Sequence, residues 1–383
     1  MSEKFVLNET SYFGRGSRTE LANEIKTRGF KKVLVVTDQT LLDCGVATKV
    51  TKILDDANIE YEIFADVKPN PTVKNVQDGV KKCKEVGADV IVTVGGGSAM
   101  DTAKGIAIIM TNPDREDVVS LNGLSNTKNR CLPIIALPTT HGTAAEVTIN
   151  YVITDESRQI KMVCVDPNDI PVLAIVDSEL METLPKGTAA ATGLDALTHA
   201  VEGYITKGHN LIADMFHMKA IELIFENLPK AVNEKDPVAI ENMSRAQYIA
   251  GMGFSNVGLG IVHSMAHQLG AVYDTPHGVA NAIILPTVME YNAPATGEKY
   301  REIARAMGVK DVDSMSQEQY RTAAIEAVKK LSVDVGIPTD LKDIVKEEDV
   351  PFLAQSAFDD ACRPGNPRDT SVEDITLLYK SLL

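Results

Sequence analysis

Asp195 and His199 are the first side chains whose types and spacing could do chemistry. They lie four residues apart in a helical pattern, so they share one face of a helix. Their neighbours are apolar, and an unpartnered carboxylate is costly to bury. A surface Asp–His pair is the ordinary interpretation of this spacing, but the apolar surroundings favour a bound divalent cation.

His263 and His267 repeat the spacing within residues 246–273, a stretch without Asp, Glu, Lys or Arg. One buried histidine is usually a hydrogen-bonded core residue, whereas two on one uncharged face favour coordination or catalysis. His277 begins the next helical pattern, fourteen residues after His263. One Asp and three His would form a site with oxygen and nitrogen donors. Such a site suits Fe²⁺ or Zn²⁺ better than Mg²⁺ or Ca²⁺.

A glycine turn, Gly95–Ser98, follows the apolar run Val90–Val94 and opens a helical pattern. Without Cβ atoms, its backbone N–H groups can approach a pyrophosphate at a helix N-terminus. The turn departs from the G-x-G-x-x-G template because residue 100 is Met, so alone it indicates a structural turn as readily as a nucleotide site. Asp101 and Lys104 fall in the first turns of the same helix.

Asp38 directly follows the apolar run Lys32–Thr37, and Thr139 and Thr140 follow another, Ile134–Leu137. The carboxyl ends of parallel strands form the edge at which open α/β sheets bind ligands. A carboxylate there can accept hydrogen bonds from the ribose hydroxyls of NAD and would repel a 2′-phosphate. The alternative interpretation is an N-cap or turn aspartate.

The elements that must position these residues change in kind near Pro185. Before it, continuous apolar runs alternate with helical patterns, which is typical of a parallel sheet covered by helices on both faces. The predicted strands are Lys32–Thr37, Val90–Val94, Ile134–Leu137 and Leu173–Val176, the helices include Val73–Val86 and Ala99–Met110, and Lys4–Phe13 is expected to form an edge hairpin.

After Pro185 the spacing is helical throughout. The predicted helices are 186–206, 210–232, 237–252, 257–272, 277–291, 298–307, 316–335 and 349–362. We therefore predict an α/β dinucleotide-binding domain with a parallel sheet over residues 1–185. An all-helical metal-binding and catalytic domain follows over residues 186–383.

The amino-acid composition limits the partners and the cellular compartment that fit this chain. Among 383 residues, 53 acidic and 38 basic side chains give a net charge of −15, which disfavours nucleic acid and anionic membranes as partners. The five cysteines lie far apart without a CxxC pair, as expected of reduced thiols in the cytoplasm. The charged N-terminus lacks a secretory signal pattern, so we expect a cytoplasmic protein.

Together these motifs resemble the iron-containing (group III) alcohol dehydrogenases over essentially the whole length. The resemblance rests on Gly95-Gly96-Gly97-Ser98-x-x-Asp101-x-x-Lys104, Pro138-Thr139-Thr140-x-Gly142-Thr143, Gly193-x-Asp195-x-x-x-His199-x-x-Glu202 and the run His263, His267, His277. It implies a dehydroquinate synthase-like fold that binds NAD(H) and Fe²⁺, with Zn²⁺ as the other candidate metal. His141 stands where the family commonly has Ala.

The resemblance also implies roles for individual residues. The metal ligands would be Asp195, His199, His263 and His277, with His267 close to the metal. The reaction also moves a proton, and His267 is our candidate for the catalytic proton relay. The cofactor contacts would be Asp38, Asn70, Gly96, Gly97, Ser98, Asp101, Thr139, Thr140, Thr143 and Lys161. The substrate pocket would be lined by Asn150, Val152, Phe254, Leu259 and Cys362.

The implied activity is NAD(H)-dependent interconversion of short-chain aldehydes and alcohols, above all lactaldehyde and 1,2-propanediol, by a homo-oligomer, with a dimer favoured. The alternatives are a polyol oxidoreductase similar to glycerol dehydrogenase and a dehydrogenase of butanol or 1,3-propanediol. A dehydroquinate-synthase-like lyase would need a basic pocket, which the metal-bearing helices lack. A protein that only binds nucleotide or metal is the non-catalytic alternative.

Overall fold

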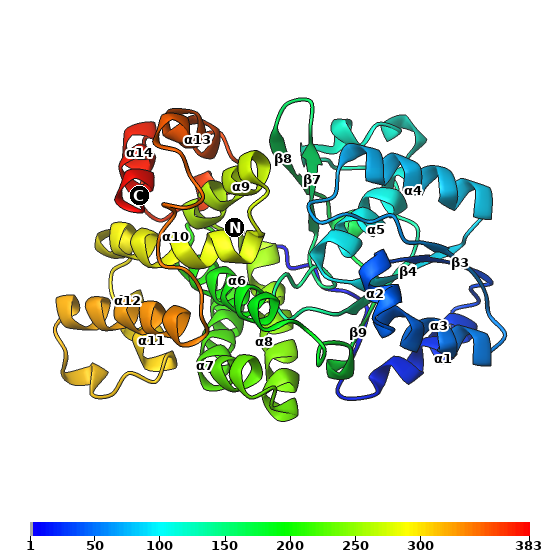
Figure 1. Cartoon of the computed structure of the whole chain (residues 1–383), viewed down its shortest axis with the longest axis horizontal. Coiled ribbons are helices and arrows are strands. Elements are labelled where there is room, and N and C mark those ends of the chain that lie inside the picture. Colours follow the sequence, from blue (N-terminus) through cyan, green and yellow to red (C-terminus); the bar gives the residue numbers. More distant parts are fainter. Residues whose placement is uncertain (1–2) are drawn as a thin grey trace. The chain divides into compact units, whose positions relative to one another are not determined.

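The computed structural model describes residues 3–383, which divide into two compact units (Figure 1). The first unit comprises the described residues up to Thr140 with Ala144–Thr183, and the second is Leu184–Leu383 with His141–Thr143. The short segment His141–Thr143, which the sequence places in the first domain, therefore clusters with the second unit. The reason is close packing, because a Cβ atom on Gly142 would lie 2.4 Å from the carbonyl oxygen of Thr192.

A six-stranded parallel sheet forms the centre of the first unit, in the order β1-β9-β6-β4-β2-β3. Its strands are β1 (Thr10–Phe13), β2 (Lys32–Val36), β3 (Glu60–Phe64), β4 (Val90–Gly95), β6 (Ile134–Pro138) and β9 (Leu173–Val176). The four strands predicted from continuous apolar runs are confirmed. The edge strand β3 was missed because its charged residues face solvent.

The predicted edge hairpin is wrong. Within residues 3–13 the only strand is β1, and it pairs in parallel with β9. Alternating hydrophobicity marks a half-exposed strand but does not reveal its partner. A strand at the sheet edge has the same pattern as one arm of a hairpin.

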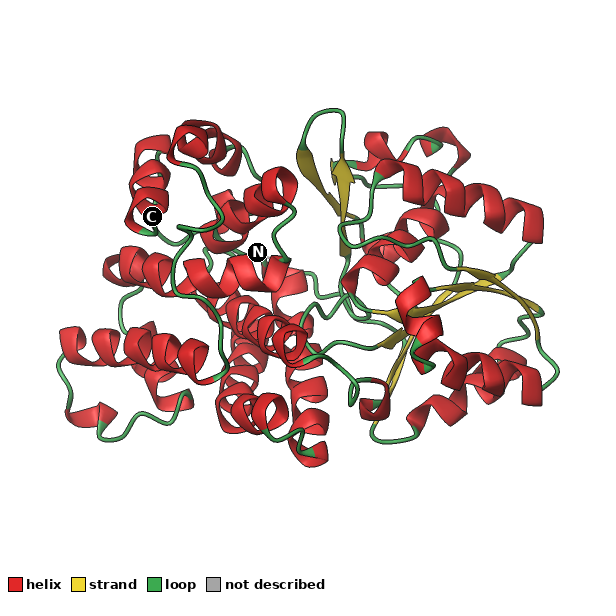
Figure 2. Ribbon diagram, in the orientation of Figure 1, coloured by secondary structure: helices red, strands yellow, loops and turns green. Residues whose placement is uncertain are grey.

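Helices cover both faces of this sheet (Figures 1 and 2). On β2, Val33 and Val35 pack in a core cluster with Val50 of α3, whereas Leu34 packs on the opposite face with Ile106 of α5. The helices of this unit are α1 (Leu21–Thr27), α2 (Gln39–Asp43), α3 (Val46–Asp56), α4 (Val73–Val86) and α5 (Gly97–Thr111). Burial on both faces explains the continuous apolar runs.

A second, three-stranded sheet has the order β5-β8-β7, with β7 and β8 antiparallel. Its strands are β5 (Gly123–Leu124), β7 (Asn150–Asp155) and β8 (Ile160–Val165). The sequence did not predict it. Strand β7 alternates between buried and half-buried residues, so it lacks the continuous apolar run by which the other strands were recognised.

The second unit contains helices and no strand among its described residues. They are α6 (Lys186–Ile205), α7 (Leu211–Asn233), α8 (Pro237–Val257), α9 (Ile261–Tyr273), α10 (His277–Asn292), α11 (Lys299–Ala306), α12 (Gln317–Asp334), α13 (Val350–Phe358) and α14 (Val372–Ser381), with short 3₁₀ turns between them. The all-helical prediction is confirmed, and only α14 was not anticipated. Throughout residues 3–383, no helix is both long and apolar enough to span a bilayer.

Candidate metal and cofactor sites

Four ligand-type side chains meet inside the helical unit. Asp195 and His199 come from α6, His263 from α9 and His277 from α10, and each offers a ligand atom within 4.8 Å of the other three. Asp195, His199 and His263 are almost completely buried, whereas His277 is partly open. The i, i+4 pair of α6 thus faces histidines from two further helices, as the sequence predicted for a four-donor site.

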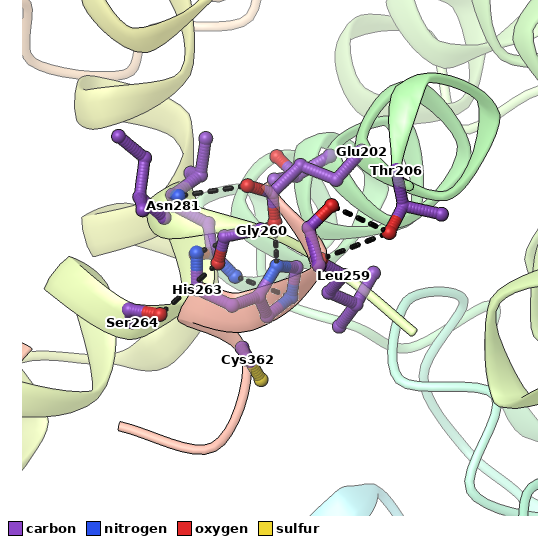
Figure 3. A network of polar contacts seen from close by, with 12 residues as sticks. Glu202, Thr206, Leu259, Gly260, His263, Ser264, Asn281 and Cys362 are labelled. Atoms are coloured by element: carbon purple, nitrogen blue, oxygen red, sulfur yellow. Dashed lines mark hydrogen bonds and ion pairs between the residues drawn. The ribbon is translucent and has the colours of Figure 1, made fainter. Parts of the chain in front are cut away.

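Glu202, one turn beyond His199 on α6, orients His263. Its Oε2 accepts a hydrogen bond from Nδ1 of His263 at 2.6 Å, and its Oε1 accepts one from the backbone N–H of Val262 at 2.7 Å (Figure 3). A proton on Nδ1 leaves Nε2 as the lone-pair donor. Burial raises the pKa of Glu202 to about 8, although hydrogen bonds from the Val262 and His263 backbone oppose the shift. A cation bound at His263 would hold this carboxylate ionised.

Asn281 of α10 shows where the donor atoms converge. Its amide nitrogen lies 2.7 Å from Oδ1 of Asp195, 3.0 Å from Nε2 of His277 and 3.2 Å from Nε2 of His263. Burial lowers the pKa values of His199 and His263, which favours neutral imidazoles with free lone pairs. One carboxylate and three imidazoles whose donors converge in an apolar interior fit a divalent transition metal.

His267 lies beside this cluster without belonging to it. Its ring stacks on that of His277 with centroids 5.4 Å apart, and its Nδ1 lies 2.9 Å from Oδ2 of Asp360. The backbone N–H of Cys362 donates to the other oxygen of Asp360 at 2.8 Å. The sequence placed His267 near the metal, but the role of Asp360 was missed. In the sequence, only its position two residues before the predicted pocket residue Cys362 indicated that Asp360 lies near the site.

The predicted pocket residues fall in both units. In the helical unit, Phe254 stacks on His199 with ring centroids 4.1 Å apart, and Leu259 is buried two residues before Ile261 begins α9. Asn150 and Val152 belong to β7 in the first unit.

Three loops of the first unit gather at the carboxyl edge of the parallel sheet. The turn Gly96–Ser98 begins α5 after β4, Asp38 follows β2, and Thr139 and Thr140 follow β6. The backbone N–H of Thr139 donates to the carbonyl of Gly95 at 3.0 Å. A Cβ atom on Gly96 would come within 3.0 Å of the Thr140 side chain. The predicted cofactor turn is therefore closely packed against the neighbouring loop, while Thr143 clusters with the helical unit.

Asp38 is the N-cap of α2, and its Oδ1 accepts a hydrogen bond from the backbone N–H of Leu41 at 3.0 Å. Capping uses one carboxylate oxygen. The other oxygen can still accept a hydrogen bond from the ribose of NAD, so Asp38 can act both as the helix cap and as a cofactor contact. A hollow next to it is lined by Gln39, Asp66 and Lys68, among others.

Other predicted cofactor residues make contacts within the protein. Lys161 donates to the side chain of Asn70. The carboxylate of Asp101 accepts a hydrogen bond from the Val152 backbone N–H at 3.0 Å, and burial raises its pKa to about 6. The fully buried Lys104 donates to the carbonyls of Thr148 and Asn150 at 2.6 and 2.9 Å. Asp101 and Lys104 thus tie α5 to β7.

A sheet with a glycine turn at its carboxyl edge and a helical unit with a buried Asp–His₃ cluster define a metal-dependent dehydrogenase of the dinucleotide-binding type. The family model for iron-containing alcohol dehydrogenases matches residues 8–178, and the model for the C-terminal part of that family matches residues 189–383. The chain belongs to the iron-containing alcohol dehydrogenase family. It is an oxidoreductase, a metal-dependent NAD alcohol dehydrogenase similar to lactaldehyde reductase.

Several known proteins are similar over their full length. Lactaldehyde reductase of Escherichia coli (strain K12) is 56% identical over 381 residues, covering 99% of both chains. NAD-dependent methanol dehydrogenase of Bacillus methanolicus is 40% identical with the same coverage. The crystal structure of a 1,3-propanediol oxidoreductase superposes with a TM-score of 0.96 at 41% identity, covering 100% of both chains. Sulfoacetaldehyde reductase of Bifidobacterium kashiwanohense, solved with NAD⁺, is 31% identical with a TM-score of 0.88, covering 100% of this chain and 99% of that one.

Proposed function

We propose that this enzyme interconverts lactaldehyde and 1,2-propanediol, using NAD(H) and an Fe²⁺ ion held by Asp195, His199, His263 and His277. The observation that carries the proposal is the convergence of these four donors within 4.8 Å in a buried helical site. The 56% identity to lactaldehyde reductase over nearly the whole chain supports the choice of substrate.

The metal would supply Lewis acidity, which makes an aldehyde carbonyl a better hydride acceptor. The protein must keep the four donors in one protonation state and one geometry. Glu202 does so for His263 through the 2.6 Å hydrogen bond, and Asn281 does so for Asp195 through a 2.7 Å hydrogen bond. These two contacts support Glu202 and Asn281 as positioning residues.

Reduction of the aldehyde also consumes a proton, and we assign its delivery to His267. An oriented imidazole transfers protons efficiently. The Asp360 carboxylate fixes the ring through Nδ1. The face-to-face packing of His267 on His277 supports a position next to the metal ligands.

For the cofactor, we propose NAD(H) bound at the glycine turn Gly96–Ser98, with Asp38 on the adenosine ribose. The N-terminus of α5, where Gly96–Ser98 are half-buried, favours the pyrophosphate. The NAD⁺ complex of a relative with a TM-score of 0.88 supports this cofactor. The further contacts assigned to Asn70, Thr139, Thr140, Thr143 and Lys161 belong to the same proposal.

A small pocket is proposed for two- to four-carbon substrates. Phe254 stacks directly on the metal-ligand candidate His199, and Cys362 lies on the segment next to His263 (Figure 3). Both side chains would limit the space beside the reacting carbon. Leu259 completes the proposed lining within the helical unit.

A substrate panel tests this proposal. Enzyme purified without oxygen and analysed for metal should oxidise NADH most efficiently with lactaldehyde, and less efficiently with glycolaldehyde, propanal and butanal. The relatives that are 41% identical and named 1,3-propanediol dehydrogenase make 3-hydroxypropanal the main competing substrate. Higher kcat/KM with that aldehyde, or with dihydroxyacetone, would favour a different alcohol dehydrogenase or a polyol enzyme.

We also propose that the enzyme acts in the cytoplasm as a homo-oligomer. All five cysteines are free thiols, which suits a reducing compartment. The edge strand β1 could pair with another copy, and sedimentation analysis would establish whether a dimer forms.

A further inference from the structure

A second group of ligand-type side chains lies beside the four-donor cluster. His267, Asp360 and Cys362 each offer a ligand atom, and these atoms lie within 4.8 Å of one another. We propose that they form a second metal site, which binds a sulfur-seeking divalent cation such as Zn²⁺ or Cd²⁺ and thereby inhibits the enzyme. The site differs from the first in its residues and in its sulfur donor.

The geometry of His267 and Asp360 already suits a shared cation. Nδ1 and Oδ2 are 2.9 Å apart, the separation of two atoms that share a proton. A metal ion that replaced this proton would take one nitrogen and one oxygen as ligands. The other carboxylate oxygen of Asp360 accepts the backbone N–H of Cys362 at 2.8 Å, which ties the thiol-bearing residue to the pair.

Burial and charge favour a cation at this point. The side chains of His267 and Asp360 are only 5% and 4% exposed. The ligand atom of Cys362 lies within 4.8 Å of those of His267 and Asp360. The negative charge of Asp360 favours a divalent cation here, which would bind the sulfur as a thiolate. One carboxylate, one thiolate and one neutral imidazole would balance the ion's charge.

The donor chemistry sets the two sites apart. Cd²⁺ favours thiolate sulfur and Zn²⁺ accepts sulfur, nitrogen or oxygen, whereas the Asp–His₃ cluster offers only oxygen and nitrogen. The rings of His263 and His267 have centroids only 6.1 Å apart, so ions in both sites would repel each other. We therefore expect the second ion to bind more weakly than the first, after the first site is filled.

Inhibition is the functional consequence, and it rests on the proposed role of His267. An ion bound to Nδ1 would take the imidazole out of proton transfer. Binding of the ion itself does not depend on that role.

Cd²⁺ titration of the anaerobically purified, iron-loaded enzyme tests the site. We expect the ultraviolet absorption of a cadmium–thiolate bond to grow to saturation at one Cd²⁺ per chain while the iron content stays constant. Cys362→Ser should abolish this absorption, and Asp360→Asn should weaken Cd²⁺ binding about 10-fold or more. Cys44→Ser is the matched control, because Cys44 is an exposed thiol on α2's C-cap, and it should leave the titration unchanged.

Three results would overturn the site. They are an undiminished band in Cys362→Ser, loss of the band in Cys44→Ser, and release of one iron for each Cd²⁺ bound. Thermal unfolding of each variant excludes misfolding as the cause of a lost signal. If Cd²⁺ binds as proposed but NADH oxidation continues unchanged, the second site stands, and the inhibition and the relay role of His267 are wrong.

Discussion

The carboxylate of Glu202 and the imidazole of His263 form a buried pair in which Oε2 lies 2.6 Å from Nδ1, with both side chains 2% exposed. The backbone N–H groups of Val262 and His263 also point at this carboxylate. Every group facing Glu202 in these contacts is a donor. The pair therefore fixes which nitrogen of His263 is left to bind a metal.

Replacing Glu202 with Gln should disturb this arrangement without changing the side-chain shape. Gln has one oxygen and one NH₂ group, so it cannot accept hydrogen bonds on both sides. The NH₂ group would face either the Val262 N–H or Nδ1 of His263, and in the second case it favours the wrong tautomer. We expect Fe²⁺ affinity to fall about 10- to 100-fold, as measured by chelator competition.

Glu241→Gln is the matched control for this variant. Glu241 lies on α8 and pairs with Arg245 at the surface, so its replacement should leave metal affinity unchanged. Equal affinity in Glu202→Gln and the wild type would mean that Glu202 only packs against α9.

Removal of the His267 imidazole separates its proposed role as a proton relay from the proposed metal binding. His267→Ala should retain its iron, because the four donors remain, but its turnover should fall about 10²-fold or more. Asp360→Asn should lower turnover less, since the ring stays in place with a weaker orienting hydrogen bond. Iron analysis together with kcat checks both variants, and parallel loss of iron and activity in His267→Ala would make His267 a ligand.

Cofactor preference depends on Asp38. Its negative charge should oppose the 2′-phosphate of NADP, although Lys68 in the neighbouring hollow offsets part of that effect. We expect kcat/KM to favour NADH by about 10-fold or more, which corresponds to about 1.4 kcal/mol. Asp38→Gly should gain activity with NADPH and lose affinity for NADH.

Asp38→Asn separates charge from helix capping. Asn is as good an N-cap as Asp, so this variant should unfold at the wild-type temperature and still accept NADPH better. If the wild type uses both cofactors equally, Asp38 acts only as the cap of α2.

Stability should decline in acid because of His217. This residue of α7 is fully buried, and burial lowers its pKa to about 3 from an ordinary value of 6.5. It fits between α6 and α8, where Cβ atoms on Gly203 and Gly253 would lie within 2.4 Å of its ring. Between these pKa values the unfolded chain binds the proton and the folded one does not. The free energy of unfolding should therefore fall as pH decreases below about 6.5, by up to about 1.4 kcal/mol per pH unit for this group.

Urea unfolding of the metal-free protein between pH 7 and 4 measures this effect. His217→Gln should flatten the pH dependence, whereas His209→Gln should not, because the His209 side chain is 41% exposed. An identical slope in His217→Gln and the wild type would contradict the assignment.

The sequence predicted the metal cluster because its residues follow helical periodicity. The i, i+4 spacing of Asp195 and His199 survives folding unchanged, since a helix fixes the relative positions of residues one turn apart. Asp360 could not be found in this way, because it lies 93 residues from His267 and meets it only through tertiary packing. Strand β7 was missed because its apolar run, Tyr151–Ile153, is only three residues long. Strand β8 was missed although Met162–Val165 form a continuous apolar run.

Asn281 has the helical spacing of the predicted ligands, but its role depends on tertiary packing. It lies four residues after His277 on α10, the same i, i+4 spacing as that of Asp195 and His199. Its side chain is an amide, a weaker ligand for a transition metal than imidazole or carboxylate, so its residue type did not indicate a place in the cluster. Its position among three donor atoms is visible only in the folded chain.

The central claim is that the Asp–His₃ cluster holds the metal on which aldehyde reduction depends, and His263→Ala tests it most directly. Wild type and variant, both prepared without oxygen, should be compared for bound iron and for NADH oxidation with lactaldehyde. The account predicts that the variant folds, loses most of its iron and has no measurable activity, because three remaining donors bind Fe²⁺ weakly. Retained iron with normal turnover in His263→Ala would contradict it.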